Sequence, residues 1–211
     1  MRSIDIAPDE IYHIYNRGNQ KQKLFYSDRD FIRMLFLILL FQSPKKFRNI
    51  SRRVDYFNDE KDFKVEYEEV IQGRFVELIN FCIMPNHFHL TVKNLTDDGI
   101  PKYLHRIQNA YGRFFNAKRD KTGHVFQGTY KAKHISSDRQ LQYVSAYIHK
   151  NPLEISDETS YKSYRWSSYQ DYVYRNRWDE LLKTGIILDG FQNNTYKNFI
   201  TSSPAKTPLD I

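Results

Sequence analysis

Polar and apolar positions follow two different periods along this chain, and each period predicts one kind of element. Alternation of apolar and polar residues predicts a strand, because successive side chains of a strand point to opposite faces. The strongest strand-like runs are Arg74–Met84 and His87–Asn94, separated by the turn-forming residues Pro85 and Asn86. We predict that these two runs pair at the centre of a sheet. Weaker strand patterns cover residues 11–15, 63–69 and 124–135.

Three other segments are predicted to be helices, over residues 28–42, 99–119 and 138–151. Each follows a residue that can cap a helix, such as Ser27 before the first. The resulting order is strand, helix, strand, strand, helix, strand, helix. This order predicts an α+β, ferredoxin-like fold, with an antiparallel sheet and helices packed mainly on one of its faces.

The regular pattern ends near residue 152, which predicts one domain over residues 1–152 followed by an appendage. Residues 45–63 are charged and lack a clear period, so we interpret them as a loop or irregular insertion. Residues 153–200 form a tyrosine-rich appendage of helical or irregular structure. Residues 201–211 hold two prolines and small residues, and we expect a disordered tail.

Cysteine content and hydropathy narrow the class of protein. The single cysteine, Cys82, cannot form an internal disulfide and lies in an apolar run, so we expect a buried thiol in a reducing compartment. The longest apolar run, Met34–Phe41, is far shorter than the roughly 20 residues that cross a bilayer. The amino terminus has no apolar signal region. We therefore expect a cytoplasmic protein without a membrane partner.

Basic and aromatic residues are concentrated between Lys102 and Arg139. This stretch holds nine Lys and Arg against two acidic residues, a surplus that equals the net charge of the whole chain, +7. Cations that neutralise phosphates, interleaved with aromatic rings that stack on bases, are typical of proteins that bind single-stranded nucleic acid. A solvated cationic face over an aromatic core stripe would give the same pattern.

His87 and His89 are the first candidates for chemistry. Residues two apart in a strand point the same way, so both imidazoles should lie on one sheet face while Phe88 points into the core. Two imidazoles make half of a metal site. A bare His-x-His is nevertheless found more often as two structural histidines on a half-buried strand.

The predicted helix over residues 138–151 offers the second half of a site. Tyr147 and Asn151 are four residues apart and share one side of the helix, whereas His149 lies on nearly the opposite side from Tyr147. Asn151 should end the helix because Pro152 disfavours helical geometry before it. Its amide oxygen could bind a metal. If the histidines are ignored, a helix-ending Asn and a tyrosine at the rim of the core are the favoured explanation of the pair.

Three motifs together resemble the single-tyrosine HUH transposases, most closely the branch of REP-associated tyrosine transposases. They are Met84–Leu90, Tyr147–Pro152 and Trp166–Tyr169, and the resemblance runs from about residue 11 to residue 172. It does not extend over the rest of the chain.

The resemblance implies a role for each candidate residue. His87, His89 and Asn151 would bind Mg²⁺ or Mn²⁺, and Tyr147 would attack single-stranded or hairpin DNA to give a 5′-phosphotyrosine and a free 3′-OH. A neutral tyrosine gains from a cation that stabilises charge on the phosphate. Relatives act as monomers or as homodimers. The candidate DNA-binding residues are Arg17, Lys102, Arg106, Arg113, Lys131 and Lys133.

Two other functions remain open from the sequence. A domesticated protein could keep the fold and the basic face and bind DNA without cleaving it; the four intact site residues favour cleavage. A zinc hydrolase that uses His87 and His89 is disfavoured because no carboxylate or cysteine has the usual ligand spacing.

Overall fold

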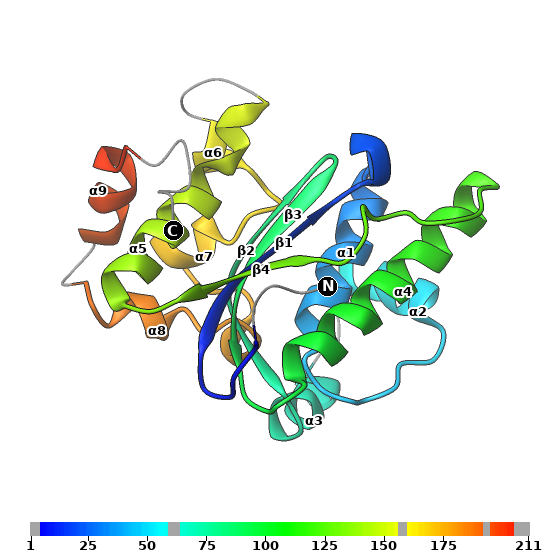
Figure 1. Cartoon of the computed structure of the whole chain (residues 1–211), viewed down its shortest axis with the longest axis horizontal. Coiled ribbons are helices and arrows are strands. Elements are labelled where there is room, and N and C mark those ends of the chain that lie inside the picture. Colours follow the sequence, from blue (N-terminus) through cyan, green and yellow to red (C-terminus); the bar gives the residue numbers. More distant parts are fainter. Residues whose placement is uncertain (1–4, 59–63, 156–159, 192–194, 205–211) are drawn as a thin grey trace.

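The computed structural model describes residues 5–58, 64–155, 160–191 and 195–204. At its centre lies a four-stranded antiparallel sheet with the strand order β2-β3-β1-β4 (Figure 1). The strands are β1 (Ile11–Arg17), β2 (Val76–Met84), β3 (His87–Asn94) and β4 (Lys131–Ile135). The predicted α+β class is confirmed, and so is the pairing of the two central runs.

The helices α1 (Asp28–Leu40) and α4 (Gly99–Arg119) cover one face of the sheet (Figure 1). Every residue from Asp30 to Leu40 is buried. An all-round apolar helix is expected where neighbours surround it. Here α4 and α2 (Ile50–Asn58) both contact α1, which also packs on β2.

The opposite face of the sheet is covered by α5 (Asp138–Lys150) and the C-terminal appendage (Figure 1). The helices are thus divided between both faces of the sheet. Leu141, Val144 and Ile148 form the buried stripe of α5, and each is at most 3% exposed. The appendage contains α6 (Ser160–Ser163), α7 (Tyr169–Val173), η3 (Asp179–Leu181), α8 (Gly185–Leu188) and α9 (Thr195–Ser202), after the turn η2 (Asn151–Glu154).

The appendage also covers the edge of the sheet that β2 forms. The backbone N–H of Ile83 donates to the carbonyl of Trp166 (2.9 Å), and the N–H of Ser168 donates to the carbonyl of Phe81 (3.0 Å). The side chains of β2 are buried apart from the half-buried Glu77. Residues 166–168 therefore satisfy an apolar edge strand that would otherwise offer unpaired backbone groups.

Two predictions for the segment before β2 are wrong. Residues 50–58 are the helix α2 and not an irregular loop, because Val54 and Phe57 are buried against α1. Residues 64–72 are the helix α3 (Lys64–Gln72) and not a strand. Residues 67, 70 and 71 point toward the core at helical spacing, a pattern that the short alternation concealed. Residues 59–63 lie outside the described part, and the status of 45–63 as an insertion stays a prediction.

Two further boundaries differ from expectation. The last strand covers only residues 131–135 of the predicted 124–135, because Gly128 has a positive φ of 62° and interrupts the extended chain. The predicted disordered tail is wrong for residues 201–204. Thr201 and Ser202 end α9, and Ser203 is buried where its carbonyl accepts a hydrogen bond from Lys150 Nζ. Residues 205–211 lie outside the described residues.

Asp30 is a buried carboxylate that ties the start of α1 to the end of α4. It accepts hydrogen bonds from the backbone N–H of Tyr26 (2.9 Å) and of Ser27 (3.2 Å). It also pairs with Lys118 (2.6 Å) and Arg119 (3.2 Å). Burial opposes ionisation, but the bonds from Lys118 and the two amides outweigh it and hold the pKa of Asp30 below its usual range.

We expect Asp30→Asn to lower the free energy of unfolding by about 3 kcal/mol at pH 7, because it leaves two cations beside a neutral buried group. The folded-state pKa is depressed, so this contribution is present above the unfolded-state pKa of about 3.9 and is lost as pH falls through the folded-state value. The difference between the two proteins should therefore shrink in acid. Urea unfolding at several pH values measures it.

Asp55→Asn is the matched control, because Asp55 pairs with Arg29 where both side chains are more than half exposed. Its loss should cost less than about 1 kcal/mol. Equal losses for the two variants would contradict the structural role of Asp30.

Candidate active site

Strand β3 presents His87 and His89 on the face of the sheet that α5 covers. Their ring centroids are 5.1 Å apart, while Phe88 between them is fully buried on the other face, against Phe126. The strand pairs on both sides, so the register fixes both rings: His89 lies opposite Tyr15 of β1 and Cys82 of β2. The predicted shared face of the two histidines is confirmed.

Helix α5 brings Tyr147 and Asn151 to this histidine pair. The Tyr147 ring centroid lies 5.4 Å from that of His89, at 89° to it. The Asn151 Oδ1 lies 2.8 Å from His87 Nε2. Asn151 caps the end of α5, as its position before Pro152 predicted. His149 points away and contacts Ser168 Oγ through its Nε2 (2.8 Å).

The hydrogen bonds of His87 indicate where a cation would fit. His87 Nδ1 lies 2.7 Å from Asn86 Oδ1, and His87 Nε2 faces the oxygen of Asn151, whose own amide nitrogen donates to Glu154 Oε1 (3.1 Å). A neutral imidazole has one N–H for these two oxygens. Burial lowers the pKa of His87, so a second proton is disfavoured. A cation bound by Nε2 and Oδ1 would satisfy both atoms, so the residues fit a metal ion.

The ligand set has a specific chemical character. Among the described residues, no group of three His, Cys, Asp or Glu side chains is arranged to hold a metal ion. A site here would consist of two imidazoles and the amide oxygen of Asn151. Nitrogen and oxygen ligands suit a hard or borderline divalent cation better than a thiophilic one.

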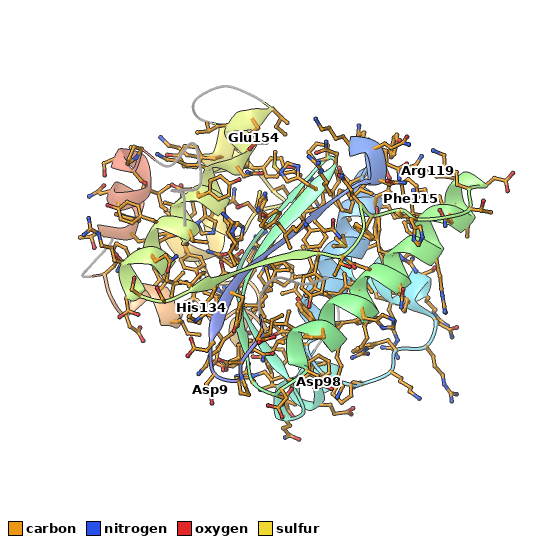
Figure 2. All side chains as sticks on the ribbon, viewed as in Figure 1. Asp9, Asp98, Phe115, Arg119, His134 and Glu154 are labelled. Carbon is orange, nitrogen blue, oxygen red and sulfur yellow. The ribbon has the colours of Figure 1, made fainter. Side chains whose placement is uncertain are left out.

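Two residues near the pair were missed by the sequence analysis. His13 of β1 lies with its Nε2 2.8 Å from His89 Nδ1. Glu154 of η2 has Oε2 4.0 Å from His87 Nε2, and it extends beyond the end of α5 (Figure 2). Alternation over residues 11–15 could have placed His13 on the same face as Tyr15. The register that brings His13 to His89 joins strands 76 residues apart and leaves no local signal.

Burial shapes the protonation of the whole cluster. It lowers the pKa of His89 well below the ordinary value and that of His13 to about 3. Both rings are thus neutral at pH 7, the form in which imidazole binds metals. Burial first, and then the charge of Glu154, raises the pKa of Tyr147 to about 12.

The predicted basic surface is divided between two parts of the molecule. Arg17, Lys131 and Lys133 project from the same sheet face as the histidines, since they pair in register with His87, Tyr15 and His13. The other three candidates lie on α4, across the sheet, and are Lys102, Arg106 and Arg113.

Two of the α4 cations already have partners within the protein. Lys102 pairs with Asp98 (2.7 Å), which lies at the opposite end of the molecule from Glu154 (Figure 2). The guanidinium of Arg106 donates to the carbonyl of Lys45 and covers the ring of Phe41. Arg113 is exposed.

Comparisons with known proteins agree with this architecture. The fold is similar to that of a solved structure described as the REP-associated tyrosine transposase bound to a REP hairpin. The TM-score is 0.54 and the sequence identity 14%, over 83% of this chain and 85% of that chain. No curated protein sequence matches the chain.

A family model also matches the part of the chain that holds the candidate site. The fold is similar to that of a REP-associated tyrosine transposase. The family model described as "Transposase IS200 like" matches residues 48–151, which span both histidines and end at Asn151. Over these residues the chain is therefore similar to the IS200-like transposase family, in agreement with the resemblance that its motifs indicated. No helix in the described residues has the length and apolarity to cross a membrane.

The raised pKa of Tyr147 can be tested directly. In the metal-free protein, we expect its hydroxyl to stay protonated through pH 10.5, because burial and Glu154 disfavour the phenolate. Carbon-13 NMR of ring-labelled tyrosine, with the Tyr147 signal assigned from Tyr147→Phe, measures this titration. Glu154→Gln should lower the pKa because it removes a negative charge. A Tyr147 hydroxyl that titrates below pH 10 would contradict the raised pKa.

Proposed function

We propose that the protein is a DNA nuclease and strand transferase of the transposase type, which cleaves single-stranded DNA through a covalent 5′-phosphotyrosine. The observation that carries the proposal is the contact between α5 and the histidines of β3. One helical turn of α5 presents Tyr147 to His89, with ring centroids 5.4 Å apart, and Asn151 to His87, at 2.8 Å. Nucleophile and ligands are thereby adjacent, as the reaction requires.

The protein's part in the reaction is positioning and proton control. The Tyr147 oxygen attacks the scissile phosphorus, an O–P bond forms, and the bond from phosphorus to the 3′-oxygen breaks. Tyr147 loses its proton and the leaving 3′-oxygen gains one. A Mg²⁺ or Mn²⁺ ion bound to His87, His89 and Asn151 would supply stabilisation of the negative charge that develops on the phosphate.

Strand joining follows from the same chemistry. The phosphotyrosine retains the energy of the cleaved phosphodiester, so a second 3′-OH can attack it and release Tyr147. No nucleotide triphosphate is needed. The rings of His13 and His89 lie 6.0 Å and 5.4 Å from that of Tyr147 between centroids and cover part of its side chain.

The proposed partner is single-stranded or hairpin DNA in the cytoplasm. The similar solved structure is bound to a REP hairpin, which supports a hairpin ligand for this chain. Arg17, Lys131 and Lys133 share the sheet face of the site, so we assign them to the DNA backbone beside the cleaved bond. Lys102, Arg106 and Arg113 could contact only a more distant part of the DNA.

A covalent adduct tests the proposed nucleophile. We expect hairpin oligonucleotides labelled at the 3′ end to become protein-linked with wild type and Mn²⁺, on a denaturing gel. Tyr147→Phe should form no adduct, because it lacks the attacking oxygen, while it still binds the oligonucleotide. Removal of the cation with EDTA should abolish the product and added Mn²⁺ should restore it.

Tyr143→Phe is the matched control. Tyr143 lies one turn earlier on α5, and its ring packs edge-on against that of Phe199 of α9, with centroids 5.6 Å apart. Its variant should form the adduct normally. Adduct formation by Tyr147→Phe would eliminate the nucleophile assignment, and wild-type binding without cleavage across many hairpins would favour the domesticated DNA-binding protein.

We further propose that Tyr147 acts in its own chain, so that a homodimer is not required. Support comes from α5, which contacts β2 and β3 of the same chain. A mixture of Tyr147→Phe and His89→Ala should then stay inactive, because neither chain holds a complete site. Adduct formation by the mixture would instead indicate helix exchange between two chains. Wild type assayed at the same total concentration is the control.

A further inference from the structure

A third histidine lies directly behind the proposed metal ligands. His13 is on β1, which pairs with β3, and its side chain is on the same face as that of His89. Its Nε2 lies 2.8 Å from His89 Nδ1, and the two rings stack with centroids 5.1 Å apart and 23° between planes. His13 is 4% exposed and His89 is 6% exposed, so bulk water does not replace this contact.

Counting protons leaves two arrangements for the pair. Each neutral imidazole has one N–H, so either His89 Nδ1–H donates to His13 Nε2 or His13 Nε2–H donates to His89 Nδ1. In the first arrangement His89 Nε2 carries a free lone pair. In the second it carries a proton and cannot bind a cation. The direction of this one hydrogen bond therefore decides whether His89 can be a ligand.

The proposed metal ligand His87 has a comparable arrangement. Its Nδ1 is held by Asn86 Oδ1 at 2.7 Å, and its Nε2 faces Asn151. Both partners are amide oxygens, which only accept, so the single proton of neutral His87 must lie on Nδ1 when a cation takes the place of a hydrogen bond at Nε2. In both histidines Nδ1 contacts a neighbouring side chain, which is Asn86 for His87 and His13 for His89. If Nδ1 carries the proton in both rings, both Nε2 atoms have a free lone pair for a metal ion.

We propose that His13 is a positioning residue that holds His89 as the Nδ1–H tautomer and so keeps its Nε2 available to a metal ion. The inference rests on the proposed function, which makes His89 a ligand. Metal-binding histidines commonly donate their other N–H to such a partner, which fixes the tautomer and the ring orientation. Without His13, the buried Nδ1–H of His89 would lack an acceptor, and the ring would rotate or change tautomer.

His13 is not itself placed to join the ligands. Its Nε2 is occupied by His89, and the other rings around it are Tyr15 at 5.1 Å and Tyr147 at 6.0 Å between centroids. On the neighbouring strand β4, Lys133 pairs in register with His13. The positive charge of Lys133 disfavours a further positive charge at the His13 ring. His13 therefore acts on the metal through His89.

Manganese binding to the DNA-free protein tests the proposal without any activity. We expect His13→Ala to weaken Mn²⁺ binding by roughly 10- to 100-fold, measured by EPR titration of free Mn²⁺. His13→Gln should recover most of the affinity, because its Oε1 can accept the same N–H. His134→Ala is the matched control: His134 is on β4 and pairs with Glu10, 2.6 Å away, in a half-exposed position. It should bind Mn²⁺ like wild type.

The tautomer itself is read by two-bond ¹H–¹⁵N NMR of the metal-free protein. Wild-type His89 should be the Nδ1–H form, and His13→Ala should raise the share of the Nε2–H form. Circular dichroism checks that each variant is folded. This measurement decides the inference even if wild type binds no Mn²⁺, a result that would count against the proposed metal site and not against the tautomer.

Three results would overturn the proposal. They are an Nε2–H tautomer of His89 in wild type, Mn²⁺ affinity of His13→Ala within twofold of wild type, or three coordinated imidazoles in the electron spin-echo spectrum of bound Mn²⁺. The third would make His13 a direct ligand.

Discussion

The candidate site depends on the packing of α5 against the sheet, because that contact alone brings the tyrosine to the histidines. A chain of buried polar groups holds the helix in place. Ser145 Oγ lies 2.5 Å from the hydroxyl of Tyr196, which lies 2.7 Å from His149 Nδ1. His149 Nε2 continues to Ser168 Oγ, which accepts the N–H of Phe81 in β2 (2.9 Å). Burial makes each of these bonds costly to break.

This arrangement assigns opposite sides of α5 to different tasks. The side with His149 is tied to the appendage and the sheet edge, and the side with Tyr147 and Asn151 is left for chemistry. A helix fastened by directional bonds cannot rotate or slide as one held by apolar contacts alone can. The appendage is therefore part of what sets the geometry of the site, although it lies outside the residues that carry the chemistry.

Much of this could be predicted from local patterns, and the remainder required contacts between distant segments. Period-two alternation was sufficient for β3 and for the shared face of His87 and His89, and the helical period separated Tyr147 from His149. The helices α2 and α3 were missed because their buried faces are short and their charged residues conceal the period. His13 was missed since its role depends on strand register, which packing of the whole sheet determines. Charge clustering in the sequence likewise gave no indication that the sheet would divide the cations.

The appendage at the β2 edge has one more consequence. An apolar strand with unpaired backbone groups is a template for pairing with other chains, and the main hazard of such an edge is aggregation. Residues 166–168 occupy that template from within the molecule. The opposite edge, β4, is five residues long and carries Lys131 and Lys133, which discourage strand addition by charge. A single tethered segment and a short cationic strand thus protect the two borders of the sheet in different ways, and only the cationic border remains attractive to a polyanion.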